Sequence, residues 1–425
     1  MRKFWFNCLM VTIFTFVFMW GLSKLLDFKM FSAFDPIGQA IGDMEISDIS
    51  YSMRKDIQEN TQVALVNIGG LSMTRADIAN EIRSIIRYKP KVIGFDVLFS
   101  YPKDTMIDFN LASALAEAKE AGVKVVLAEK LWQSSKLVDS DTKEQDSIEH
   151  AIDLIRQDFY EGYVNLDTDA EHQEDLKSCR RVNPRIKVAG KDELAYSVMM
   201  AWLSDSVKTK KFLDRNNETE IINYSGNVVD MHGASDTTYH NKMFLLDPDQ
   251  ALDTTYVPEY EQNIKGRVVL FGFLGEDIFD TSWDDKFFTP INKNYAGKTR
   301  PDMYGVVVHA NIVTMILNED YVHEMADWQE YLVAFLVLIL TVGLFFKIEE
   351  KMPIWYDLLS LFIQVVLVII FSIVMVVAFT YFSVKLNFTL TLAAAALVGT
   401  CFEVYNGGVL RLYQVITSKF TKPKE

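Results

Sequence analysis

The distribution of apolar residues along the chain predicts four membrane-spanning helices, one near the N-terminus and three near the C-terminus. Residues 4–22 form an apolar run long enough to cross a bilayer as a helix. Similar runs cover residues 331–346, about 358–381 and about 388–405. Within residues 27–330 no run is both long and apolar enough to span. The pattern therefore indicates one helix, a large body and then three helices.

The first apolar run is expected to stay in place as an anchor rather than to be removed as a signal peptide. Arg2 and Lys3 give it a basic start, but the run is longer than a usual signal-peptide core and no A-x-A-like cleavage site follows it. The predicted domains are an anchor at 1–26, a body at 27–330, three membrane helices at 331–405 and a short tail at 406–425.

Inside the body, short apolar runs alternate with segments of helical pattern. The strand-like runs, such as VALVNI and VKVVLAE, are apolar throughout rather than alternating. Such strands in β-α-β order are typical of a parallel sheet with helices on both faces. The predicted fold class is therefore an α/β domain with a mainly parallel sheet covered by helices, plus four transmembrane helices. The predicted strands are 63–68, 91–99, 123–129, 161–166, 221–226 and 267–275, and the predicted helices are about 74–88, about 108–121, near 148–158, 191–205 and 305–318.

Lysine and arginine residues near the ends of the apolar runs predict the orientation in the membrane. Cytoplasmic loops are enriched in these residues, and the loop at 382–387 has only Lys385. The N- and C-termini are therefore expected in the cytoplasm and the body on the extracytoplasmic side. The basic residues that set this orientation are Arg2, Lys3, Lys347, Lys351, Arg411, Lys419, Lys422 and Lys424.

Charge and cysteine content narrow the function classes. The net charge is −15 and both segments that flank the body are basic, so the body carries the excess of negative charge. A body this acidic is not expected to bind nucleic acid or anionic lipid. Cys179 is alone in the body, so no disulfide forms within it and the fold depends on its core.

Polar residues occur where the predicted strands end. Asn67 closes the first strand and Asp96 lies near the end of the second. In an open parallel sheet, ligands gather at the carboxyl ends of the strands. Asp96 is therefore a candidate for ligand binding, and a structural role in holding the loop that follows the strand is the alternative.

Further candidates lie after the last strand and at the start of the last helix of the body. Asp96, Asp285 and His309 together offer the oxygen and imidazole donors that several divalent metals accept. Structural hydrogen bonds across loops are the alternative, and the sequence assigns neither a metal nor a cofactor. Asp280 and Asp284 lie in the same acidic loop as Asp285. The ligand-binding candidates are Asn67, Asp96, Asp285, Thr289, His309 and Asn311.

Motifs of known catalytic chemistry are missing, so the sequence predicts no enzyme. It contains no G-x-S-x-G elbow, no H-E-x-x-H, no P-loop and no C-x-x-C. The last apolar run instead carries Thr391, Ala395 and Gly399 at four-residue spacing. Small residues on one face allow helices to approach closely in lipid. This face is expected to pack either against neighbouring helices of the chain or against a partner or second copy.

The body resembles the CHASE type 2 domain, the extracytoplasmic sensory domain of bacterial histidine kinases, adenylate cyclases and related receptors. The matching segments include VALVNIGG, KVIGFDVLFSYPKD, VKVVLAEK, GYVNLDTD, INYSG, KGRVVLFGFLGEDIFD, DDKFFTP and MYGVVVHANIVTMIL. The layout of one helix before the domain and three after it is also similar to that family. The resemblance implies a bacterial inner-membrane protein that senses a signal outside the cytoplasm. The family tends to work as dimers because its output domains do, and that reason is absent from this chain, so a homodimer stays an open alternative.

Two departures from the family pattern shape the functional expectations. The first strand is followed by LSMTRADIANE, where the family more often has a longer loop, and only residues 406–425 follow the last helix. We therefore expect a sensor or receptor subunit that signals through a separate membrane or cytoplasmic protein subunit. The alternatives are a structural scaffold of a membrane complex and an extracytoplasmic hydrolase that uses Asp96, Asp285 and His309.

Overall fold

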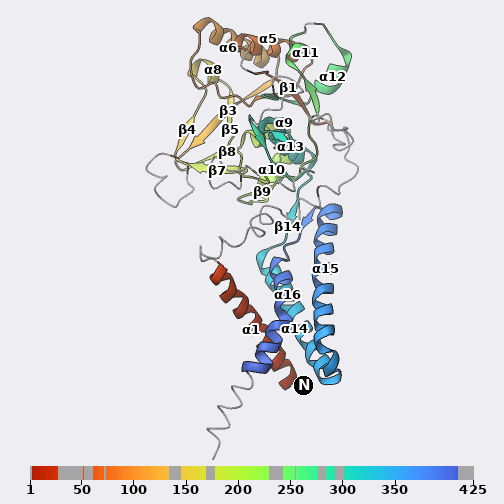
Figure 1. The fold of residues 1–425 in the computed structure, drawn as a ribbon. Coiled ribbons are helices and arrows are strands. Elements are labelled where there is room, and N and C mark those ends of the chain that lie inside the picture. Colours follow the sequence, from red (N-terminus) through yellow and green to blue (C-terminus); the bar gives the residue numbers. More distant parts are fainter. Residues whose placement is uncertain are drawn as a thin grey trace, which may run out of the picture. The chain divides into compact units, whose positions relative to one another are not determined.

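The chain forms two compact units. The α/β unit covers Arg54–Val322, and the helical unit comprises Met1–Met53 and His323–Glu425. Both are seen in Figure 1. The predicted boundary between the anchor and the body lies at residues 26 and 27, where a described segment ends. Most of the predicted tail, 406–425, lies outside the described residues. The computed structural model describes residues 2–26, 51, 61–70, 73–133, 145–168, 178–228, 243–253, 255–275, 284–291 and 301–409.

A seven-stranded, mainly parallel sheet forms the centre of the α/β unit, as the sequence predicts. The strand order is β10-β1-β11-β2-β3, with β5 parallel and β4 antiparallel to β3. Every residue of β1, β2 and β11 is buried, because helices cover both faces of the sheet (Figure 1). The strands are β1 (Val63–Asn67), β2 (Val92–Phe95), β3 (Lys124–Trp132), β4 (Ser147–Glu149), β5 (Tyr160–Tyr163), β10 (Phe244–Leu246) and β11 (Val268–Gly272).

One face of the sheet packs against a layer of helices in which α5 and α6 lie side by side. Alternate strand residues such as Ile93, Leu127 and Phe271 point into the core that this layer covers. The core also includes residues of α8, α11 and α12. The helices of this layer are α5 (Arg75–Ile86), α6 (Thr105–Glu120), α8 (Asp153–Arg156), α11 (Pro248–Leu252) and α12 (Pro258–Ile264).

The opposite face packs against α9 (Tyr196–Ser204) and α13 (Gly305–Asn318), with α10 (Ser206–Asp214) beside them. Glycine makes close packing possible here: a Cβ atom on Gly162 of β5 would lie 2.7 Å from the Cα atom of Tyr196. The α9 backbone therefore lies directly on the sheet. Short ladders complete the unit: β6 (Arg181–Val182) with β9 (Glu220–Ile221), β7 (Arg185–Val188) with β8 (Lys191–Leu194), and β12 (Lys286–Phe287) with β13 (Met303–Tyr304).

Capping side chains determine where the two helices of the first layer begin. Thr74 and Asp77 form the predicted capping box of α5, in which the Thr74 amide donates to Asp77 Oδ2 over 2.8 Å. The α6 helix begins at Thr105 rather than at the predicted Asp108, because Asp104 accepts from the amides of Met106 and Ile107 and acts as the N-cap.

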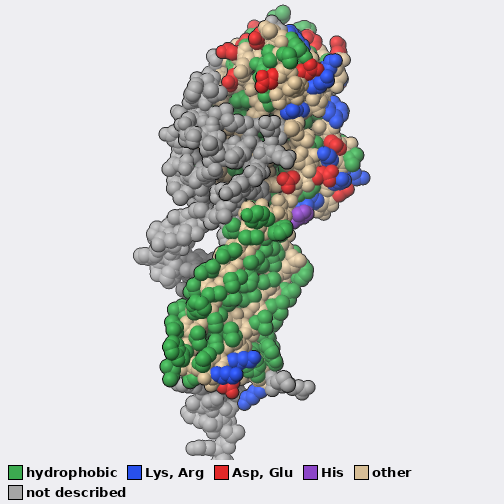
Figure 2. Space-filling model, turned by 90° about the vertical axis from the view of Figure 1, so that its right-hand side faces the viewer, with side chains coloured by type: hydrophobic (Ala, Val, Ile, Leu, Met, Phe, Trp, Pro, Cys, Tyr) green, Lys and Arg blue, Asp and Glu red, His purple; other side chains and the backbone are tan. Residues whose placement is uncertain are grey.

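Among its described residues, the helical unit has four helices long and apolar enough to cross a membrane, in agreement with the sequence prediction. Apolar side chains cover the face of this unit seen in Figure 2, and Lys and Arg side chains gather at one end. The α16 helix contacts each of the other three. A two-residue parallel ladder joins β14 (His323–Glu324) to β15 (Val384–Lys385). The helices are α1 (Arg2–Leu26), α14 (Asp327–Lys351), η1 (Pro353–Trp355), α15 (Tyr356–Phe382), α16 (Thr389–Val404) and the π-helical turn η2 (Tyr405–Val409).

The small residues of α16 lie on its buried face. Thr391 is fully buried, Ala395 is 1% exposed, and Gly399 is also buried. The Gly399 amide donates to Gln364 Oε1 of α15 over 3.2 Å. A Cβ atom on Gly399 would lie 2.4 Å from Gln364 Nε2, so the absence of a side chain is what admits the glutamine. In this chain the small residues therefore pack against neighbouring helices.

Candidate functional site

The carboxyl ends of three adjacent parallel strands meet at one edge of the sheet, where the sequence places several candidates. Asn67, the last residue of β1, lies in register with Gly272 of β11. Asp96 follows β2 directly, and its amide donates to the carbonyl of Phe271 in β11 over 2.8 Å. Parallel sheets bind ligands at this edge.

Asn67 connects the two turns that follow β1 and β11. Its side chain is fully buried. Its Oδ1 atom accepts from the amides of Gly69 and Leu274, both over 3.0 Å, and its Nδ2 atom donates to the carbonyl of Gly275 over 3.1 Å. These backbone contacts use the hydrogen-bonding groups of the amide, so the geometry gives Asn67 a structural position.

Thr289 is also occupied by contacts within the protein. Its hydroxyl donates to Asp302 Oδ2 over 2.5 Å and its amide to Asp302 Oδ1 over 2.8 Å. The pair joins the segment that follows β12 to the segment that precedes β13. Thr289 is fully buried.

Asn311 holds the loop after β9 against α13. Its Oδ1 atom accepts from the amides of Ser225 and Gly226 over 2.9 and 3.1 Å. Its Nδ2 atom donates to the carbonyls of Gly226 and Val307, both over 2.9 Å. Asn67, Thr289 and Asn311 thus share one property: their polar groups bind the protein's own backbone or side chains.

Asp96 and Asp285 form a pair of interacting carboxyl groups. Burial raises the pKa of Asp96 well above its usual range, and the negative charge of Asp285 raises it further. Asp96 is half-buried, whereas Asp285 is exposed. We therefore expect Asp96 to hold a proton at pH values where an ordinary aspartate is ionised.

Asp285 lies at the first turn of α13. Its carbonyl accepts from the Gly305 amide over 3.0 Å, and its carboxylate oxygens would lie 3.2 and 3.3 Å from a Cβ atom on Gly305. A helix N-terminus stabilises negative charge. Asp285 itself has a φ of 54°, in the left-handed region. The turn therefore places the carboxylate at the start of the helix that also carries His309.

Tyr196, the first residue of α9, is a member of this cluster that the sequence analysis did not identify. It is fully buried, and no described residue makes a hydrogen bond with its hydroxyl. Burial raises the pKa of Tyr196 and the charge of Asp96 adds to the effect. The hydroxyl would lie 2.5 Å from a Cβ atom on Gly94 of β2. A glycine inside an apolar strand is the sequence signal for such a close approach.

His309 of α13 completes the cluster. Its ring lies edge-on to Tyr196, with 5.2 Å between the ring centroids. The side chain is 2% exposed, and burial lowers the pKa of His309 to about 4 despite a hydrogen bond to the backbone of Val164. The imidazole is therefore neutral at pH 7, and its Nδ1 atom has no hydrogen-bond partner among the described residues.

The polar cluster of Asp96, Tyr196, Asp285 and His309 combines neutral donors and acceptors with one exposed carboxylate. Buried polar atoms without partners are rare in proteins and are usually satisfied by water or a ligand. The arrangement suits recognition of a small polar molecule. It does not suit a metal held by Asp96, Asp285 and His309: among the described residues, the His and carboxylate donors within 4.8 Å of one another are those of Glu129, His150 and Glu161. Asp280 lies outside the described residues.

Comparison with known proteins finds one family. The model of the CHASE2 domain matches residues 11–345, which is well over half of the chain. The match extends from α1 through the α/β unit into α14. No curated protein and no solved structure matches the chain.

Proposed function

The chain belongs to the CHASE2 family, and from this premise we propose that it is a membrane-anchored sensor subunit that signals through a separate partner chain. It is a membrane protein in which an extracytoplasmic-type sensory domain lies between membrane helices. No output domain is detected in its 425 residues. In this proposal a separate partner chain carries the output domain through which the sensor subunit acts.

The observation that carries the sensory role is the pair of buried, unpartnered polar atoms, Tyr196 Oη and His309 Nδ1, on neighbouring rings. A small polar ligand that donates to His309 and accepts from Tyr196 satisfies both. Asp285 at the exposed side of the cluster favours a ligand with a positively charged or hydrogen-bond-donating group.

The α13 helix offers a route from the polar cluster toward the membrane. It carries His309, and Asp285 contacts its first turn. Residues 319–326 are all that separate the end of α13 at Asn318 from the start of α14 at Asp327. A ligand that shifts α13 therefore acts on a short connection to a membrane helix.

We place the protein in a bacterial inner membrane with both termini in the cytoplasm. The support is the distribution of basic residues: α1 begins with Arg2 and Lys3, and α14 ends with Lys347 and Lys351. The positive-inside rule assigns these ends to the cytoplasm. The α/β unit then lies on the extracytoplasmic side, and the partner is reached through the helices or the C-terminal segment.

Ligand-dependent thermal stabilisation tests the sensory role. The full-length protein in detergent is screened against small polar metabolites such as amino acids, polyamines and sugars, because a ligand that binds the folded state raises Tm. The stabilisation is expected to fall in Tyr196→Phe and to persist in Tyr224→Phe, since the Tyr224 hydroxyl already donates to the Cys179 carbonyl over 2.8 Å. Equal stabilisation of both variants would place the ligand elsewhere.

Purification from the native membrane tests the partner. Mass spectrometry of proteins retained at a constant ratio should identify a kinase, cyclase or other signalling protein. Envelope or membrane-machine subunits at fixed ratio, together with no ligand response, would instead support a structural scaffold. A homo-oligomer that retains no other protein would count against both the sensor subunit and the structural scaffold.

A further inference from the structure

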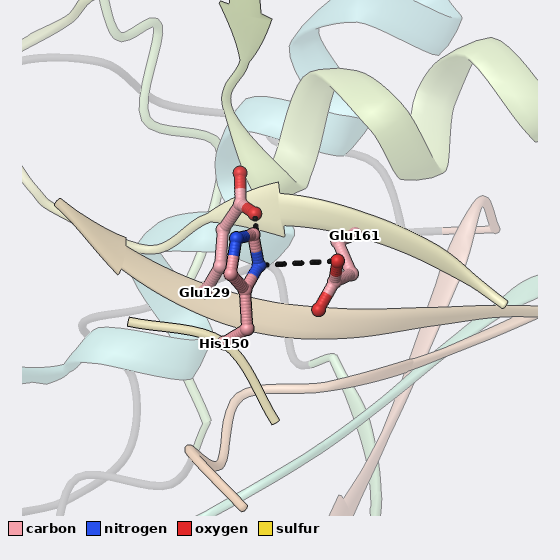
Figure 3. A group of neighbouring side chains, drawn as sticks. All are labelled: Glu129, His150 and Glu161. Carbon is pink, nitrogen blue, oxygen red and sulfur yellow. Dashed lines mark ion pairs between the residues drawn. The ribbon is translucent and has the colours of Figure 1, made fainter. Parts of the chain in front are cut away.

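A second group of ionisable side chains lies on β3 and β5, with Glu129 on the sheet face opposite to Asp96. Glu129 belongs to β3, Glu161 belongs to the neighbouring β5, and His150 follows β4 directly. Leu127 of β3 is in register with Glu161, and Lys130 of β3 is in register with Glu149. This register brings two carboxylates and one imidazole together, as Figure 3 shows.

The distances within this triad match those between ligands of one metal ion. His150 Nδ1 lies 3.2 Å from Glu129 Oε2 and 3.2 Å from Glu161 Oε2 (Figure 3). One donor atom from each residue lies within 4.8 Å of the others. Ligands bound at about 2.1 Å around a tetrahedral zinc ion lie about 3.4 Å apart. Little rearrangement is therefore needed for the three atoms to share a cation.

The burial of Glu129 points to a missing partner. The Glu129 side chain is 3% exposed and lies on the same sheet face as the core residues Val125 and Leu127. Its Oε2 atom is ion-paired with His150, but its Oε1 atom and Glu161 Oε1 have no hydrogen-bond partner among the described residues. A buried carboxylate oxygen without a partner is costly, so these two oxygens are placed to receive a ligand.

The electrostatics around the triad favour a cation. The carboxylates of Glu161 and Glu193 add negative charge near Glu129, and Arg156 is the cation that opposes them there. The Arg156 Nε atom is 3.8 Å from Glu161 Oε2 and offsets only one negative charge. A divalent cation would compensate the charges of the two carboxylates of the triad.

We propose that Glu129, His150 and Glu161 form a binding site for a divalent transition-metal ion, with Zn²⁺ as the first candidate. A mixed set of imidazole and carboxylate donors suits Zn²⁺ and related ions, whereas Mg²⁺ prefers octahedral oxygen and water. Three protein ligands leave one tetrahedral position open, as in zinc sites that bind water or substrate. Glu129 of β3 and Asp96, which follows the neighbouring β2, lie on opposite faces of the sheet, and the metal site does not depend on the sensory role.

Zinc binding to the full-length protein in detergent tests the site. The protein is stripped with a chelator, dialysed against buffered Zn²⁺ alone, and bound zinc is measured by elemental analysis. Wild type is expected to bind one more equivalent of zinc than His150→Gln. Glu161→Gln is expected to lower the affinity for that zinc ion by about 100-fold. Glu117→Gln is the control, because Glu117 pairs with Arg83 in the same unit and outside the triad.

The Co²⁺ spectrum of the wild-type protein gives a readout that does not depend on the folding of any variant. Co²⁺ bound at a four-coordinate site gives visible absorption bands that report directly on the ligands, and these bands should be absent in His150→Gln and present in Glu117→Gln. Glu161 is 17% exposed, so Glu161→Gln is the variant best able to fold. Wild-type zinc stoichiometry and affinity in both His150→Gln and Glu161→Gln would overturn the site and leave only an ion-paired triad.

Discussion

Asn67 shows how one buried side chain can organise the edge of a parallel sheet. It joins the turns after β1 and β11 through three backbone contacts of 3.0, 3.0 and 3.1 Å. The polar cluster lies at the same edge, where Asp96 follows β2. The geometry of the cluster therefore depends on a residue that does not belong to it.

Replacement of Asn67 by alanine should destabilise the α/β unit. The substitution leaves two buried amides and one carbonyl without partners, at a cost of about 1 kcal/mol or more each. We expect the free energy of unfolding to fall by about 2–4 kcal/mol, measured by denaturant titration with tryptophan fluorescence. Asn263→Ala, which removes an exposed bond to the Glu259 carbonyl, should change it by less than about 0.5 kcal/mol. Equal effects of the two variants would contradict this reading of Asn67.

His309 should make stability depend on pH in a defined window. Its pKa is about 4 in the folded state and about 6.5 when unfolded, so between these values the unfolded state binds more protons. The stability that His309 contributes is therefore full above about pH 6.5 and is lost as the pH falls toward 4. The raised pKa of Asp96 acts in the opposite direction, since its contribution is lost as the pH rises above about 4.

The difference in unfolding free energy between wild type and His309→Gln separates the contribution of His309 from that of Asp96. The stability advantage of wild type should shrink by up to about 3 kcal/mol between pH 6.5 and pH 4, measured by unfolding at several pH values. Asp96→Asn in the same series should instead improve relative to wild type as the pH rises. A pH-independent difference between wild type and His309→Gln would show that the buried imidazole does not titrate in this way.

At the scale of elements, α15 and α16 are joined by a glycine and a glutamine. Gln364 Nε2 donates to the Ser360 carbonyl over 3.1 Å, and Gln364 Oε1 accepts from the Gly399 amide. The amide group of Gln364 thus has partners inside an apolar segment, where an unpaired polar group is costly. Gly399 is required because any Cβ atom there meets the glutamine side chain.

A double-mutant cycle should reveal this contact. Gly399→Ala forces Gln364 out of its position and should lower the thermal stability of the helical unit in detergent. In a Gln364→Ala background the same substitution has room, so its cost should largely disappear, which gives a coupling energy of about 1 kcal/mol. Gly407→Ala is the control, because a Cβ atom there meets nothing within 4 Å. Additive effects of Gly399→Ala and Gln364→Ala would rule the contact out.

The elements of the fold were largely predictable, because a strand buried on both faces must be apolar throughout. The runs at 63–68 and 267–275 contain β1 and β11 for this reason. The start of α6 was misplaced because Asp104 and Asp108 are both acceptable in a first turn. Only the structure shows that Asp104 caps the helix, whereas Asp108 pairs with Arg75.

The sites were harder to predict, because they depend on contacts between segments distant in sequence. Tyr196 joins the polar cluster only because α9 lies on Gly94. The metal triad depends on how β3 pairs with β4 and β5. The register of a strand depends on its hydrophobic pattern and on turn geometry, and the three residues of β4, Ser147–Glu149, carry little apolar pattern. Sequence reasoning did locate Asp96, because it lies near a strand end, and Asp285, because it lies in an acidic loop.

At the scale of the whole molecule, orientation in the membrane decides what each unit can encounter. A ligand from outside the cytoplasm reaches the polar cluster only if the α/β unit is extracytoplasmic. A cytoplasmic partner is reached only if the basic ends of α1 and α14 face inward. Lys347 and Lys351 at the end of α14 therefore matter for function although they touch neither site.

Cysteine accessibility in spheroplasts should establish this orientation. The three native cysteines, Cys8, Cys179 and Cys401, are all buried, so background labelling is low. A membrane-impermeant maleimide should label Lys103→Cys, which is exposed in the α/β unit, but not Glu350→Cys, which is exposed at the end of α14. Glu350→Cys should become labelled once the membrane is opened with detergent, which shows that the thiol is reactive. Labelling of Glu350→Cys in sealed spheroplasts would place the end of α14 outside and would exclude a cytoplasmic partner at that end.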